Sequence, residues 1–84
     1  MTVANAIKKL EKLSGQTVTK NDVNEYSVIY KGHVASFMAN GGGDDNERSA
    51  TCYHLRRVGD KSDAQTDYFA GSFYDNLTQM FKNL

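Results

Sequence analysis

Apolar and polar side chains alternate along two neighbouring stretches of the chain, 25–30 and 33–39. Because successive side chains of a strand point to opposite faces of its sheet, this pattern predicts two β-strands. Lys31-Gly32 between them predicts a two-residue hairpin turn, since glycine adopts positive φ without steric cost. The pairs predicted to share the core face are Tyr30 with His33, Val28 with Ala35, and Tyr26 with Phe37. The opposite, open face then carries Ser27, Ile29, Val34, Ser36 and Met38.

A helical spacing of apolar residues predicts two helices, one near each end of the chain. Thr2 and Gly15 suit the N-cap and C-cap of a first helix over residues 3–14. Ser72 suits the N-cap of a second helix over residues 72–83. The apolar faces are Val3, Ala6, Ile7, Leu10 and Leu13 for the first helix, and Phe73, Leu77, Met80, Phe81 and Leu84 for the second.

A third strand is predicted over residues 49–58, and polar stretches separate the elements. Residues 16–24 predict either a connector or a short edge strand. Residues 40–47 contain three consecutive glycines followed by acidic residues, and they predict a mobile loop. Residues 59–67 predict a second polar loop. In the third strand, Thr51, Tyr53 and Leu55 share the predicted core face, and Cys52 and His54 share the other.

These elements predict one small domain of the α+β class that spans residues 1–84. Its predicted order is a helix, a three-stranded antiparallel sheet formed by the hairpin and the third strand, and a C-terminal helix. Both helices are expected on the aromatic face of the sheet, because layer packing then buries the large apolar residues.

Composition narrows the class of partner. The chain has 10 basic and 10 acidic residues and a formal net charge of zero, which disfavours a general polyanion binder. Cys52 is the only cysteine, so an internal disulfide and a cysteine-based zinc site are excluded. No signal core or membrane-spanning apolar run occurs, and we expect a cytoplasmic protein without membrane partners. The size is typical of compact accessory proteins of phages or mobile elements.

The candidate chemistry is weak at each position. Asp60, Asp63 and Asp67 lack the alternating ligand spacing and the distant glutamate of a calcium loop, so solvated carboxylates are the favoured interpretation. Cys52 and His54 share one strand face, but no orienting carboxylate or oxyanion-hole motif accompanies them. We therefore predict no enzyme activity and assign no catalytic, cofactor-binding or metal-binding residue.

The open face of the hairpin is the leading candidate site. Apolar residues there would form a contact surface for a partner protein or a second copy of the chain. The predicted surface consists of Ile29, Val34 and Met38, with Arg56 at its rim. The leading hypothesis is accordingly a small non-enzymatic protein-interaction module or homodimer.

A basic patch supports an alternative hypothesis. It consists of Lys8, Lys9, Lys12 and Arg57. The helix–three strands–helix order also resembles that of double-stranded-RNA-binding domains, and the resemblance implies phosphate contacts by basic residues. Those domains carry basic residues at the start of the second helix, whereas residues 66–72 here contain none. Weak RNA binding is thus the alternative to protein binding.

Overall fold

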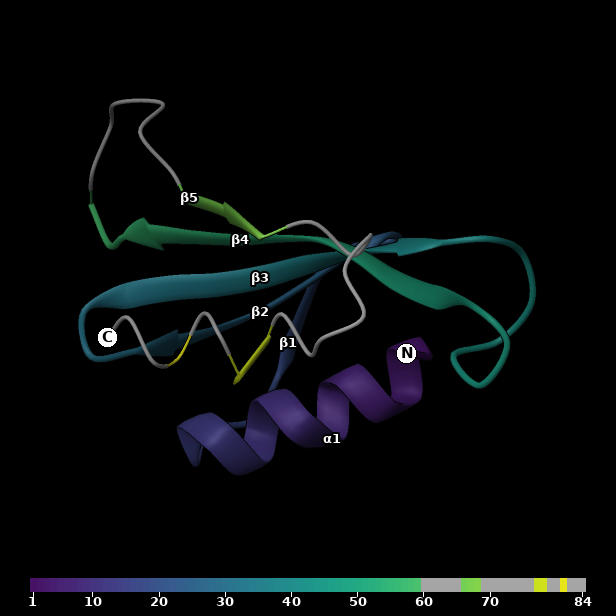
Figure 1. The fold of residues 1–84 in the computed structure, drawn as a ribbon, viewed down its shortest axis with the longest axis horizontal. Helices are drawn as coiled ribbons and strands as arrows, with labels where there is room; N and C mark the ends of the chain where they lie inside the picture. Colours follow the sequence, from purple (N-terminus) through teal and green to yellow (C-terminus); the bar gives the residue numbers. More distant parts are fainter. Residues whose placement is uncertain (60–65, 69–76, 79–80, 82–84) are drawn as a thin grey trace.

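The strands of the chain pair in sequence order, each antiparallel to the next (Figure 1). The structure, a computed structural model, describes residues 1–59, 66–68, 77, 78 and 81. Helix α1 packs on one face of the sheet and contacts β2 and β4. The elements are α1 (Val3–Ser14), β1 (Thr19–Asp22), β2 (Glu25–Tyr30), β3 (His33–Asn40), β4 (Ser49–Arg57) and β5 (Thr66–Tyr68).

The predicted three-stranded sheet with two helices was wrong, although the α+β class holds. Strands β1 to β4 form an antiparallel sheet, and the three-residue β5 adds to the edge at β4. Strand β1 confirms the edge-strand alternative for residues 16–24. All four of its residues are polar and exposed, so it shows no alternation of apolar and polar side chains. The described residues contain one complete helix, α1. Residues 72–83 lie mostly outside the described part; the three of them that the structure describes, Leu77, Thr78 and Phe81, have helical backbone.

The bounds of α1 confirm the sequence prediction, because both caps form. The Thr2 hydroxyl accepts a hydrogen bond from the Asn5 N–H at 3.2 Å. Gly15 adopts a left-handed conformation with φ of 69°, and its N–H donates to the Glu11 carbonyl at 2.8 Å. Both signals are local in the sequence, which is why they can be read without the fold.

The predicted register of the β2–β3 hairpin is also confirmed. Lys31 and Gly32 form its turn, with φ values of 50° and 73°. The observed cross-strand pairs are Tyr30 with His33, Ile29 with Val34, Val28 with Ala35, Ser27 with Ser36, and Tyr26 with Phe37.

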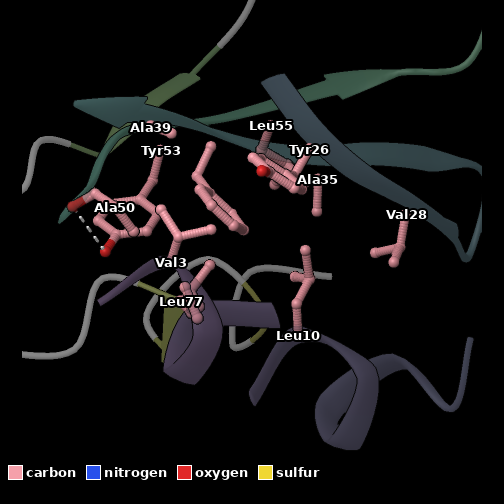
Figure 2. Close-up of a cluster of buried hydrophobic side chains, with 12 residues drawn as sticks. Val3, Leu10, Tyr26, Val28, Ala35, Ala39, Ala50, Tyr53, Leu55 and Leu77 are labelled. Atoms are coloured by element: carbon pink, nitrogen blue, oxygen red, sulfur yellow. Dashed lines mark hydrogen bonds between the residues drawn. The ribbon is translucent and has the colours of Figure 1, made fainter. Parts of the chain in front are cut away.

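The core lies between α1 and the sheet face that carries the aromatic side chains (Figure 2). Phe37 is fully buried at its centre; its ring stacks on Tyr26 at 5.2 Å and lies 6.2 Å from the ring of Tyr53. Three neighbouring strands thus contribute one aromatic row, a geometry that adds to the gain from burial alone. The buried apolar residues are Val3, Ala6, Leu10, Tyr26, Val28, Ala35, Phe37, Ala39, Ala50, Tyr53, Leu55 and Leu77.

Strand β4 contains a β-bulge at which Cys52 and Tyr53 together oppose Phe37 of β3. Cys52 has a φ of 50°, a left-handed conformation that accommodates the extra residue. The extra residue reverses the alternation of side chains before it. Ala50, 3% exposed, therefore faces the core in the place predicted for Thr51, and that prediction was wrong.

The second half of the loop predicted to be mobile, residues 40–47, contacts the start of α1. The first N–H groups of a helix have no partner within the helix. Here the Val3 N–H donates to the Arg48 carbonyl, and the next N–H donates to the Asp45 carbonyl, both at 2.9 Å. The Arg48 N–H in turn donates to the Asp44 carbonyl at 2.9 Å. The loop thus supplies backbone acceptors that α1 requires.

Replacing Lys31 tests the turn that sets the hairpin register. A side chain other than glycine, asparagine or aspartate adopts positive φ at a cost. We expect Lys31→Asn to raise the free energy of unfolding by about 0.5 to 1 kcal/mol. Urea denaturation measures the change, with the β-branched Lys31→Val as the control expected to lose stability. Equal stability of all three chains would contradict the left-handed turn.

We expect ionisation of Tyr53 to lower the free energy of unfolding at high pH. Burial raises the pKa of its hydroxyl above the ordinary value of 10.0, because the charged form is desolvated. The unfolded chain therefore loses this proton at lower pH than the folded chain. The corresponding stability is fully present below about pH 10 and is lost as the pH rises through the raised folded pKa.

Tyr53→Phe is the matching variant, since it removes the ionisable group and its 3.4 Å hydrogen bond to the Ala50 carbonyl (Figure 2). We expect the variant to be slightly less stable at neutral pH and to lose stability less steeply above pH 10. Denaturant unfolding of both chains at several pH values measures how steeply the free energy of unfolding falls as the pH rises. An equally steep fall in the two chains would contradict the raised pKa of Tyr53.

Candidate interaction surface

The open face of the sheet, opposite the core, carries three cross-strand rows of side chains. The register places Ile29 opposite Val34, and Val34 opposite Arg56. The structure thus brings these three predicted surface residues together, whereas Met38 lies two rows away. From the hairpin turn outward, the rows are Ile29, Val34 and Arg56; Ser27, Ser36 and His54; and Glu25, Met38 and Thr51.

Exposure within these rows is uneven. Ile29 is 61% exposed, and Arg56 is also exposed, whereas Val34 and Met38 are half-buried. The exposed apolar area is therefore concentrated at Ile29, in the row nearest the hairpin turn. Between this row and Met38 lie two serines and His54, so the patch is smaller than the sequence suggested.

A groove of about 330 Å³ adjoins Ile29 on its β1 side. Within it the Ser27 hydroxyl donates to the Asn21 side-chain oxygen at 2.6 Å. The lining residues are Gln16, Thr17, Thr19, Asn21, Ser27, Val28 and Ile29. The sequence gives no signal for this groove, because it depends on where β1 separates from β2.

A buried guanidinium lies at the end of the sheet remote from the hairpin turn. Arg48 is 8% exposed, and its Nη2 donates to the Val23 carbonyl at 2.9 Å and to the Asn24 side-chain oxygen at 2.8 Å. Its Nη1 lies 3.7 Å from the Asp45 carboxylate, which accepts the Tyr26 hydroxyl at 3.1 Å. This cluster ties the β1–β2 turn to the loop beneath α1, a structural role that sequence analysis missed.

The basic residues of the alternative hypothesis lie on two elements. Lys8 and Lys12 are exposed on α1, and Lys9 is half-buried there. Arg57 is exposed at the end of β4, where it pairs with His33. The correction to the sheet removes the strand count on which the resemblance to double-stranded-RNA-binding domains was based.

The remaining candidates do not assemble into a catalytic or metal site in the described part of the chain. Cys52 is half-buried in the bulge, and its Sγ lies 3.8 Å from the Thr51 hydroxyl. Asp67 lies in β5, whereas Asp60 and Asp63 fall outside the described residues. Among the residues that the structure describes, no three His, Cys, Asp or Glu side chains are grouped to hold a metal ion.

Comparison with known proteins yields no relative. No family model, curated protein or solved structure matches the chain. The described residues also contain no helix long and apolar enough to cross a membrane.

Removing the Arg48 guanidinium tests its structural role. We expect Arg48→Met to lower the free energy of unfolding by about 2 to 3 kcal/mol, because a buried hydrogen-bonded charge is lost and its acceptors remain. For a domain of this size that corresponds to a fall in Tm of roughly 10 °C or more. Thermal and urea unfolding measure it.

Arg56→Met is the matched control, because Arg56 is exposed and its loss is expected to change stability by less than about 0.5 kcal/mol. Arg48→Lys keeps the charge with fewer donors and should fall between the two. Equal effects of the two methionine substitutions would contradict the structural role of Arg48.

Proposed function

We propose that the protein is a non-enzymatic interaction module that associates through the open face of its sheet, with a second copy of itself or with another protein. The single observation that carries the proposal is the 61% exposure of Ile29 beside Val34, on the face that α1 leaves uncovered. Arg56 completes the row and provides a charged rim. Apolar contact at the centre with polar groups around it is the usual composition of an interface.

The rows beyond Ile29 determine what such a partner must cover. A stable interface buries about 800 Å² on each partner, which exceeds the area of a few side chains. The serine row and the row with Met38 must therefore also be covered. Ser36 is small and Ser27 is only 6% exposed, so neither side chain obstructs a second sheet at the usual packing distance of about 10 Å. A flat sheet partner satisfies these requirements.

Ile29→Glu tests self-association through this face. Burying the exposed part of Ile29 gains about 1 to 2 kcal/mol, and a two-fold interface contains the residue twice. Replacing it should therefore weaken a homodimer by about 30-fold to 1,000-fold. Light scattering and sedimentation over a range of concentrations measure the effect, and Val34→Glu should act in the same direction.

Val23→Glu is the matched control, because Val23 is 67% exposed in the β1–β2 turn and lies outside the three rows. It should leave the association unchanged, and apolar association should persist in high salt. A wild-type monomer at every concentration would reject the homodimer. Binding to a double-stranded RNA that weakens steeply with salt would instead favour the basic residues of α1.

A further inference from the structure

Strand β1 pairs with only half of β2. The pairs are Thr19 with Ser27, Lys20 with Tyr26, and Asp22 with Glu25. The second half of β2, residues 28–30, has no partner on the β1 side among the described residues. Within the described part of the chain, the sheet therefore has an unpaired backbone edge next to Ile29, an exposed apolar side chain of the open face.

The hairpin determines which backbone groups this edge presents. In a two-residue hairpin the residues flanking the turn exchange both hydrogen bonds, and the bonding direction then alternates along each strand. Tyr30 flanks the turn, and at the far end of β2 the Asn24 carbonyl accepts the Ala39 N–H at 2.7 Å. Even-numbered residues of β2 thus bond to β3. The N–H and C=O of Ile29 point to the β1 side, where no backbone partner occurs among the described residues.

A specific contact keeps β1 from covering this edge. The Val18 N–H donates to the Glu11 carboxylate of α1 at 2.9 Å, and the Val18 side chain packs against the core. Residues 16–18 therefore turn toward α1 instead of continuing along β2. The groove of about 330 Å³ opens where the two segments separate.

The chemistry of the groove limits what it can bind. Its seven lining residues are all uncharged, and five of them carry hydroxyl or amide groups. A charged ligand would lose hydration there without gaining an ion pair. An extended peptide segment supplies a backbone donor and acceptor that can pair with those of Ile29, and short uncharged side chains suit the hydroxyl and amide lining.

We infer that this groove binds a short, extended, uncharged segment of a partner protein, which pairs with the backbone of Ile29 and adds a strand to the free edge of β2. The inference rests on the proposed protein-binding function and names the kind of partner. The proposed strand pairing depends on the backbone of Ile29 and on the groove, whereas association through the open face depends on the rows of side chains.

Amide hydrogen exchange and NMR chemical shifts test the inference on the full chain. The probe is acetyl-Thr-Val-Thr-Val-Thr-amide at millimolar concentration, and the control peptide is the same sequence with an N-methyl group on every residue. We expect the first peptide to slow exchange of the Ile29 N–H at least tenfold and to shift residues 16–21 and 27–29. The fully methylated peptide should do neither, because none of its residues keeps a backbone N–H to pair with a strand on either edge.

Thr17→Glu should weaken binding of the probe at least tenfold, because it introduces a charge into the groove, and Val23→Glu should leave it unchanged. No protection of Ile29 by the probe would overturn the inference, and the light-scattering result would still decide the proposed function independently. Chemical-shift changes confined to Val34 and Met38 would overturn the inference and would indicate binding to the open face of the sheet. Concentration-dependent protection of Ile29 without peptide would overturn it in favour of a second copy.

Discussion

The left-handed turn at Lys31 and Gly32 is the constraint on which the rest of the structure depends. It fixes the register of β2 against β3, and a strand shifted by one residue exchanges its two faces. Such a shift of β2 would move Tyr26 to the open face, away from its stack with Phe37, and would turn Ile29 toward the core. The turn also sets which backbone groups of β2 point away from β3. The core, the open face and the free edge are therefore consequences of one local geometry.

The bulge at Cys52 determines which residues at the start of β4 face the core. The hairpin turn alone does not determine this. With regular alternation from Tyr53, the polar Thr51 would face the core near the start of α1. The extra residue places Ala50 there, and its N–H donates to the Met1 carbonyl at 2.9 Å. The bulge thus lets β4 pair with β3 at both ends and with the N-terminal segment as well. A left-handed Cys52 is the local cost of this arrangement.

A feature could be predicted from the sequence when the residues that determine it lie close together in the chain. The hairpin and α1 were predictable because Gly32, Thr2 and Gly15 act on residues within a few positions. Strand β1 has four exposed polar residues, so nothing distinguishes it from a connector until β2 is present. Arg48 binds groups 24 and 25 positions away in the chain, and no spacing pattern indicates them. The bulge occurs at a cysteine, where glycine would have been a signal.

Ile29 couples the two surfaces of the proposed interaction module. Paired residues of neighbouring strands point their side chains to the same face of a sheet. A segment that pairs with the backbone of Ile29 therefore places its own side chain beside the row of Val34 and Arg56. Occupation of the edge would extend that row by one strand and enlarge the open face available to a second contact. On the proposed function, a segment on the edge and a partner on the face would therefore bind side by side and would not compete for the same groups.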